Sequence, residues 1–243
     1  MNFPSIRITI FKQLIDLTEK LIFERNILKF YRKEFKQVCH TVIDVGANKG
    51  QSIDFFLKLN PACLIFALEP NPALFRLLQK KYHDNKNIKI FNLGISNHSG
   101  EKLFFENVLD YTSTFEDLNP DSVYLKKKAR ILGVKPGNII VDKYPVNVIT
   151  LKEFINEQLP STEIDILKID TEGHEYYCLQ GLFTDNKSVP VNYIQIENHN
   201  DDMYRNRVPY EKIHELLNEN NFMEYKTISH GFGDLDEVVY KRK

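Results

Sequence analysis

Short apolar, mostly β-branched runs alternate with helical stretches from residue 41 onward, and this alternation constrains the fold more than any other sequence feature. Such runs are typical of strands that are buried on both faces of a parallel sheet. The five that fit best are 41–45, 63–69, 88–95, 164–170 and 191–197. Strands that alternate with helices form an open sheet with helices on both faces, so we expect an α/β fold.

Helices are expected between these strands. Their predicted starts lie near Asn48, Pro72, Leu151 and Glu175. Proline suits a first helical turn because its missing N–H would have no intrahelical partner there. Helical connections between parallel strands pack against the faces of the sheet.

The C-terminal segment follows a different pattern. A helix over 210–220 precedes two strand-like runs, 222–229 and 237–243, which turn-forming residues separate. Two strands joined by so short a link pair antiparallel, so the chain is expected to end in a β-hairpin.

Residues 1–40 form a predicted helical arm before the α/β domain, which we assign to residues 41–243. Apolar residues recur at three- and four-residue steps over 8–38, as in an amphipathic helix. Eight basic and four acidic residues lie in this stretch and the seven residues before it, and they surround the helix rather than occupy one face. We therefore favour packing of the arm on the domain over contact with a membrane or a partner subunit.

The composition is that of a soluble globular protein with nearly balanced charge. The 243 residues include 32 Lys and Arg against 33 Asp and Glu, so no global positive field would hold the chain on a phosphate backbone. Nucleic acid is therefore not an expected partner. Three cysteines without paired spacing indicate reduced thiols, and no apolar run is long enough to span a membrane. These features predict a cytoplasmic protein.

Residues 100–144 interrupt the alternation of strands and helices. They contain a strand-like run, KLFFEN, four hydroxyl side chains at 111–114 and a basic cluster at 126–130. Long insertions in compact α/β domains are usually functional, so we predict an insertion or substrate loop that selects the acceptor. The basic cluster is either a contact for an anionic acceptor or a solvated helix face, which is the commoner case.

The first chemical motif is VIDVGANKG at 42–50, a strand followed by a glycine turn and a helix. Gly46 and Gly50 permit close approach of a ligand to the backbone, and the following helix offers N–H donors. The third glycine of a dinucleotide motif is missing, and Asp44 precedes the turn. A carboxylate in this position suits a cationic ligand better than a pyrophosphate.

Glu69 ends the second strand, where a carboxylate can accept hydrogen bonds from both ribose hydroxyls of an adenosine. A glycine turn after the first strand and an acid after the second together indicate an adenosine-containing cofactor. The end of the 88–95 run, with Gly94, Ile95 and Ser96, would cover adenine, although the sequence there also fits a simple turn.

The second chemical block, DILKIDTEGHEYYCLQGL at 165–182, ends a strand in Asp170 and begins a helix. Glu172, His174 and Glu175 crowd the turn between them. Ligands of open parallel sheets bind outside the carboxyl ends of the strands, so these side chains should face the same crevice as Asp44 and Glu69. The end of the 191–197 strand adds Glu197, Asn198 and His199 to that crevice.

Together these blocks resemble the FkbM-type family of S-adenosylmethionine-dependent methyltransferases. VIDVGANKG, EPNP, VITLKEF and LKIDTEGHEYYCLQG occur in the family's order, and the K-I-D-x-E-G-x-E block is its most specific feature. The resemblance implies a class I methyltransferase (Rossmann-like) fold, an open, mostly parallel seven-stranded sheet with helices on both faces and an antiparallel C-terminal hairpin. It also implies S-adenosyl-L-methionine as the cofactor and O-methylation of a hydroxyl, often on a sugar of a glycan, polysaccharide, glycolipid or secondary metabolite.

The resemblance also implies roles for individual residues. The methionine end of the cofactor would be lined by Asp44, Gly46, Asn48 and Gly50. Glu69 would hold the ribose. Ile95 and Ser96 would flank adenine, and Asp170 would stand near the sulfonium.

A protonated alcohol is a poor nucleophile, so a base near the acceptor should contribute about 10²–10⁴ in rate. The candidate catalytic residues are Asp170, Glu172, His174 and Glu197, with His199 beside them, and the residues alone do not rank the bases. A metal-assisted reaction would use Asp170, Glu172, Glu197 and His199 as ligands for Mg²⁺. Because the chain has no compact metal motif, the sequence assigns no metal.

Two other function classes fit part of the sequence. An NAD(P)-dependent oxidoreductase would use the same glycine turn and acid but has no role for the block at 168–175. A cofactor-binding module without turnover would tolerate replacement of Glu172, His174 and Glu197. The methyltransferase hypothesis explains more residues, and it predicts a sugar or other small-molecule hydroxyl compound as acceptor.

Overall fold

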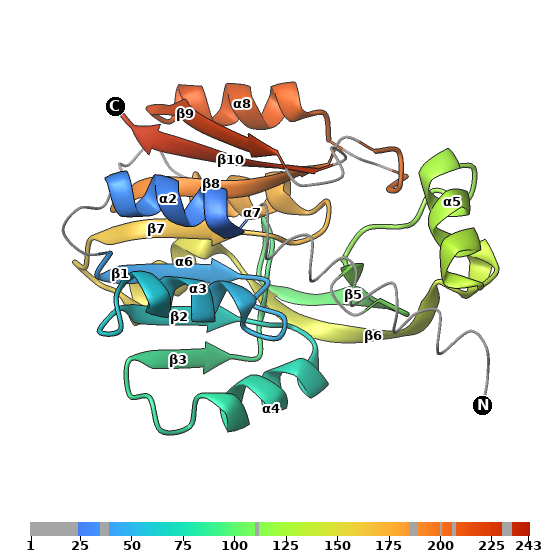
Figure 1. The fold of residues 1–243 in the computed structure, drawn as a ribbon, viewed down its shortest axis with the longest axis horizontal. Helices are drawn as coiled ribbons and strands as arrows, with labels where there is room; N and C mark the ends of the chain where they lie inside the picture. The colour runs from blue at the N-terminus through green and yellow to red at the C-terminus, as the bar shows by residue number, and fades with distance from the viewer. Residues whose placement is uncertain are drawn as a thin grey trace.

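The computed structural model describes residues 24–34, 39–109, 112–184, 189–199, 201–205, 208–229 and 235–243. Its main feature is a seven-stranded sheet in the order β3-β2-β1-β7-β8-β10-β9 (Figure 1). Five of these strands are parallel: β1 (Thr41–Val45), β2 (Leu64–Leu68), β3 (Ile88–Phe91), β7 (Ile164–Ile169) and β8 (Val191–His199). The predicted open, mostly parallel sheet is confirmed.

The C-terminal strands β9 (Phe222–Ser229) and β10 (Leu235–Arg242) confirm the predicted antiparallel pair. β10 lies between β8 and β9 and runs antiparallel to both, so β9 forms the edge of the sheet. Burial explains this order: Val238, Val239 and Tyr240 of β10 are buried, whereas most of β9 is exposed. The more apolar strand takes the inner position because both of its faces are covered there.

Helices cover both faces of the sheet, as predicted (Figure 1). One face is covered by α2 (Glu24–Glu34), α3 (Gln51–Leu59) and α4 (Pro72–Lys81). The other is covered by α6 (Leu151–Gln158), α7 (Glu175–Leu182) and α8 (Tyr210–Glu219). Side chains of β1 alternate between the two faces, as this arrangement requires. Val42 packs on the side of α2, α3 and α4, and its neighbour Ile43 packs on the side of α6, α7 and α8.

Only part of the predicted arm, 1–40, is described. Helix α2 packs on the domain through Ile27 and Tyr31, which are buried, and the Tyr31 hydroxyl donates to Gln195 Oε1 at 2.5 Å. The predicted packing is therefore confirmed for this helix, while the rest of the helix predicted over 8–38 lies outside the described residues. Among the described helices, none is long and apolar enough to cross a membrane.

The insertion is more regular than the sequence predicted. β5 (Gly100–Asn107) and β6 (Ile140–Ile149) pair with β4 (Gly94–Ile95) in a second sheet of order β4-β6-β5. Helix α5 (Val123–Leu132) and a short 3-10 helix (Pro136–Asn138) connect β5 to β6. The sequence analysis missed β6. In this strand Val146 and Val148 are buried and alternate with exposed residues, one of which is Pro145.

The single strand predicted over 88–95 is wrong. The run divides into β3 and β4, which belong to different sheets. Between them, the Asn92 side-chain amide donates to the carbonyl oxygens of Glu69 and Pro70, each at 2.9 Å. These bonds hold the chain at the end of β2 and direct it into the second sheet.

We expect Gly181→Ala to destabilise the fold. Gly181 lies in α7, and a Cβ there would lie 2.2 Å from the backbone oxygen of Ser96. In an open helix this change stabilises by about 1 kcal/mol, but forced contact in a packed interior costs about 1–3 kcal/mol. Urea unfolding measures the difference. Gly137→Ala is the control because nothing lies within 4 Å of its Cβ, and unchanged stability of Gly181→Ala would contradict the packing.

Candidate active site

The carboxyl ends of β2, β1, β7 and β8 lie side by side, and they bring the predicted acids to one edge of the sheet (Figure 1). Backbone bonds join these ends: Gly46 N–H donates to Leu68 O, and Asp170 N–H donates to Val45 O, both at 3.0 Å. Ligands of open parallel sheets bind at such an edge. We call the space outside these four strand ends the crevice.

The glycine turn after β1 has three residues with positive φ: Gly46 at 86°, Asn48 at 49° and Gly50 at 82°. A Cβ on Gly46 would lie 1.9 Å from Asp170 O, and one on Gly50 would lie 2.4 Å from the Tyr82 hydroxyl. Both glycines are therefore required by close contacts within the protein as well as by their φ. The sequence analysis had attributed them to ligand approach alone.

Glu69 follows β2 and is buried, with 4% of its surface exposed. Its carboxylate accepts from the N–H of Asn48 at 2.8 Å and from the N–H of Asn71 at 2.9 Å. Burial raises the pKa of Glu69 to about 7, although these two donors oppose the rise. Glu69 thus links the glycine turn to the end of β2 and titrates near neutral pH.

Lys168 is a site residue that the sequence analysis missed. It lies on β7 opposite Asp44 of β1, is buried, and its Nζ donates to Asp170 Oδ2 at 2.7 Å. Burial lowers the pKa of Lys168, but Asp170, Glu237 and Asp44 outweigh burial and hold the pKa above its usual range. The signal in the sequence was one basic residue within the largely apolar run 164–169.

Asp44 is completely buried, so its environment differs from that of a solvated strand-end acid. Its Oδ2 accepts from the Ser52 hydroxyl, while Oδ1 is buried without a hydrogen-bond partner. Burial raises the pKa of Asp44, and the nearby Lys168 opposes that rise. Asn48 Oδ1 is likewise buried without a partner. Two acceptor oxygens near the glycine turn therefore lack donors within the described protein.

Three of the predicted catalytic acids converge in the crevice. Ligand oxygens of Asp170, Glu172 and Glu197 all lie within 4.8 Å of one another, a spacing at which they could also hold a metal ion. The side chain of His199, which the sequence analysis placed beside them, is outside the described part of the structure. We call Asp170, Glu172 and Glu197 the acidic triad.

Glu172 is held in an unusual backbone conformation, with φ at 55°. The Tyr204 hydroxyl donates to its Oε2 at 2.8 Å, and the Thr114 hydroxyl donates to its backbone oxygen at 2.7 Å. Left-handed residues other than glycine persist where their surroundings impose the conformation, often at functional sites. The sequence analysis missed Tyr204, since nothing in residues 201–205 matches a chemical motif.

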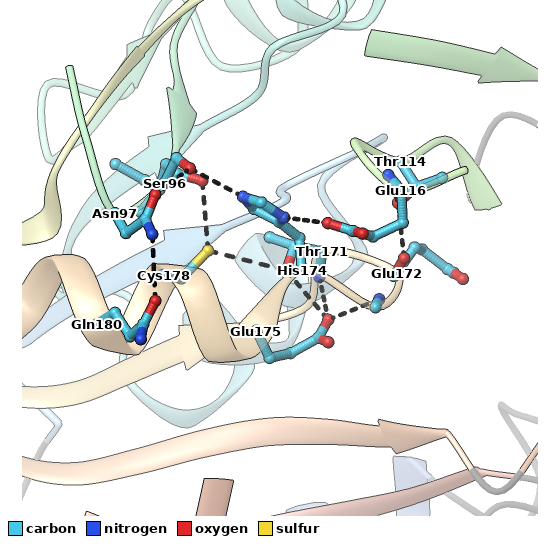
Figure 2. A network of polar contacts seen from close by, with 12 residues as sticks. Ser96, Asn97, Thr114, Glu116, Thr171, Glu172, His174, Glu175, Cys178 and Gln180 are labelled. Atoms are coloured by element: carbon cyan, nitrogen blue, oxygen red, sulfur yellow. Dashed lines mark hydrogen bonds and ion pairs between the residues drawn. The ribbon is translucent and has the colours of Figure 1, made fainter. Parts of the chain in front are cut away.

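His174 does not face the crevice. Figure 2 shows its ring between Ser96 and Glu116, with Nδ1 at 2.6 Å from Glu116 Oε1 and Nε2 at 3.0 Å from Ser96 Oγ. An ionised Glu116 can only accept, so Nδ1 donates to it, and Nε2 accepts from the Ser96 hydroxyl. The prediction of His174 as a base is corrected: the side chain is fully buried, and both nitrogens are engaged.

The two residues predicted to flank adenine, Ile95 and Ser96, are also buried. Their side chains are 1% and 0% exposed. Ile95 packs in the main core, where the sequence analysis had expected a strand end open to the crevice. The physical reason is that α7 lies on this segment, with Gly181 against the backbone of Ser96.

The hydroxyl side chains at 112 and 113, in the predicted substrate loop, form hydrogen bonds within the loop. Thr112 Oγ1 donates to Leu109 O at 3.0 Å, and Ser113 Oγ accepts from the N–H of Asn107 at 3.1 Å. Tyr111 lies outside the described residues. The contacts of Thr114 and Glu116 attach this loop to the start of α7 (Figure 2). The insertion therefore borders the acidic triad.

Comparison with known proteins identifies the family. The family model of the methyltransferase FkbM domain matches residues 44–224. The chain belongs to this family. It is an S-adenosylmethionine-dependent methyltransferase of the class I fold, and its cofactor is S-adenosylmethionine. The family match favours this activity over the oxidoreductase alternative.

Solved structures similar to this FkbM methyltransferase have low sequence identity. Magnesium protoporphyrin IX methyltransferase from Synechocystis PCC 6803 is 11% identical, with 100% of this chain and 85% of that chain covered and a TM-score of 0.49. A SAM-dependent methyltransferase from Aquifex aeolicus is 12% identical, with 100% of both chains covered and a TM-score of 0.46. Aeropyrum pernix fibrillarin is 10% identical, with 84% and 67% covered and a TM-score of 0.45. No curated protein matches the chain.

The residues of the crevice fit this cofactor. The unpartnered oxygens of Asp44 and Asn48 are acceptors that the ammonium group of a methionine could satisfy. Glu69 and Asp170 add carboxylates, against the buried ammonium of Lys168. An acidic crevice suits a ligand that carries a sulfonium and an ammonium charge.

The Glu116–His174–Ser96 contacts predict a pH-dependent stability. Burial lowers the pKa of His174 below its usual 6.5, with Lys102 and His98 adding to the effect and Glu116 opposing it. A group whose pKa is lower in the folded protein than in the unfolded chain stabilises the fold at pH values above its unfolded-state pKa. This stabilisation is lost as the pH falls through the folded-state pKa. Wild type should therefore lose more unfolding free energy than His174→Gln between about pH 7 and about pH 5.

Urea unfolding at several pH values measures this difference. His83→Gln is the matched control, since His83 lies at the surface with 69% of its side chain exposed. The arrangement in Figure 2 would be contradicted if His174→Gln and His83→Gln showed the same pH dependence as wild type.

Proposed function

We propose that this FkbM methyltransferase methylates a hydroxyl oxygen, on a sugar or a similar hydroxyl-rich small molecule. The observation that carries the proposal is the acidic triad, whose oxygens lie within 4.8 Å of one another at the carboxyl-end edge of the sheet. Carboxylates accept hydrogen bonds from hydroxyl groups and can receive the proton that a hydroxyl loses on methylation. Nearly balanced charge supports a small acceptor over nucleic acid.

We assign the cofactor contacts from the same edge. Glu69 would accept from the ribose hydroxyls, and the turn at Gly46 and Asn48 would line the methionine end with Asp44 beneath it. S-Adenosylmethionine, when bound, supplies a methyl group on a positively charged sulfonium. Asp170 would face that charge, with its carboxylate held in place by Lys168.

Glu172 is our candidate general base. It is half-buried, and both its carboxylate and its backbone are held by residues from other segments, Tyr204 and Thr114. In the reaction the acceptor oxygen would gain the methyl group and lose its proton to the Glu172 carboxylate. Glu197, which is 7% exposed, would help to position the acceptor. The odd number of cysteines, without paired spacing, supports a cytoplasmic site of action.

Cofactor binding is tested by calorimetric titration of S-adenosylmethionine, S-adenosylhomocysteine and NAD. We expect the two adenosyl compounds to bind and Glu69→Gln to weaken both about tenfold, or about 1.4 kcal/mol. Because the pKa of Glu69 is about 7, binding to wild type should weaken as the pH falls below that value, and Glu69→Gln should lack this dependence. Glu211→Gln on the exposed surface of α8 is the control. Binding of NAD alone would overturn the assignment.

Methyl transfer is tested with labelled S-adenosylmethionine and a panel of sugars and other alcohols. Glu172→Gln should lower kcat by about 10²–10⁴ and leave cofactor affinity unchanged. Glu157→Gln, an exposed change on α6, is the matched control. If a chelator abolishes activity and Mg²⁺ restores it, the acidic triad holds an ion, and Glu172 is not the base. Transfer to nitrogen acceptors alone would contradict O-methylation.

A further inference from the structure

Positive charge gathers on and just after helix α5 of this nearly neutral chain. Residues 122–141 contain five basic residues and no acidic residue, whereas the whole chain has a net charge of −1. Four of the basic residues lie on helix α5 and one follows it. At four positions the side chain is exposed: Lys126, Lys127, Arg130 and Lys135.

Helix α5 has a buried side and an exposed side. Leu125, Ala129 and Leu132, at positions i, i+4 and i+7, are buried, and the first two pack with Ile139, Met203 and Tyr204. The opposite stripe is exposed, and we call it the α5 face. It consists of Val123, Lys126, Lys127, Arg130 and Ile131. The helix is therefore anchored to the domain with this face turned outward.

The α5 face is apolar as well as basic. Among the described residues, seven large apolar side chains are exposed, and three of them lie in 122–141. Val123 is 76% exposed, Ile131 is 41% exposed, and Val141, at the start of β6, is 57% exposed. Single exposed apolar residues are ordinary, but on the α5 face Val123 and Ile131 lie beside three cations. That combination suits a surface that offers both negative charge and apolar groups.

Helix α5 lies at the crevice end of the sheet (Figure 1). Figure 1 shows α5 beyond the carboxyl ends of the parallel strands, at the same end of the sheet as the acidic triad. Tyr204 connects the two directly, because it packs against the buried side of α5 and its hydroxyl donates to Glu172. A surface bound by α5 would therefore lie near the crevice.

We propose that the α5 face docks on a lipid bilayer that contains acidic phospholipids. The lysine and arginine side chains match the negative charge of the headgroups, and Val123 and Ile131 can enter the boundary between headgroups and acyl chains. A polyanionic glycan or nucleic acid would satisfy the charges but offers little to the apolar side chains. The binding is expected to be reversible, because one short helix face provides only a few charges and two apolar residues.

The test is co-sedimentation of the full-length protein with vesicles, with no cofactor or acceptor present. We expect binding to phosphatidylcholine vesicles that contain phosphatidylglycerol and none to phosphatidylcholine alone, with loss at high salt. The double variant Lys127→Glu/Arg130→Glu should bind at least about tenfold more weakly. The double variant Val123→Ser/Ile131→Ser should also bind about tenfold more weakly, although it keeps every charge.

Arg76→Glu/Lys80→Glu is the matched control, because it reverses two exposed charges on α4 and changes the net charge equally. It should retain vesicle binding, and circular dichroism of all variants should show unchanged folding. The proposal is overturned if wild type does not sediment with acidic vesicles, or if the control loses as much affinity as Lys127→Glu/Arg130→Glu. It is equally overturned if heparin binds the protein and the serine variant keeps full vesicle affinity. None of these readouts depends on methyl transfer, so the proposed function is judged separately.

Discussion

Lys168 places an ammonium group among three carboxylates, Asp44 of β1, Asp170 after β7 and Glu237 of β10. It donates to Asp170 at 2.7 Å, lies opposite Asp44, and is close enough to Glu237 for that carboxylate to raise its pKa. Buried carboxylates without a cation would have to protonate or move apart. The ion pair therefore allows β1, β7 and their acidic ends to remain adjacent, and the crevice depends on that adjacency.

The same polar cluster extends along the face of the sheet that α2, α3 and α4 cover. Gln195 Nε2 donates to Glu237 at 2.8 Å, and Gln195 Oε1 accepts from the Tyr31 hydroxyl of α2. All three side chains are buried. Helix α2, which precedes the α/β domain in the sequence, thus contributes a hydrogen bond to Gln195, the partner of the Glu237 carboxylate that raises the pKa of Lys168. Buried polar groups tolerate few arrangements, so this network favours a single placement of α2.

A second buried contact joins the insertion to the site. His174 follows the acidic turn directly, and its ring lies between Glu116 of the insertion and Ser96 of the β4 segment (Figure 2). Thr114 adds a bond to the backbone of Glu172. The loop that the sequence marks as a substrate element is therefore attached to the acidic triad by its own side chains. We infer that an acceptor would meet the insertion and the triad as one surface.

By itself, the sequence determined most strands of the main sheet and the edge at which the predicted acids gather. Apolar runs such as 41–45 and 164–169 specify buried strands locally, and an acid at the end of a parallel strand must lie at the carboxyl-end edge, so Glu69, Asp170 and Glu197 were predictable. Only the tertiary structure decided which polar side chains stay accessible. His174 follows the acids in the sequence, and Ser96 was expected to lie near them. Contacts between distant segments bury both side chains, whereas Tyr204 holds Glu172 in the crevice. Ser96 and His174 are 78 residues apart in the sequence, and Glu172 and Tyr204 are 32 residues apart. No sequence pattern predicts such pairs, because their contact depends on how strands and loops pack rather than on local geometry.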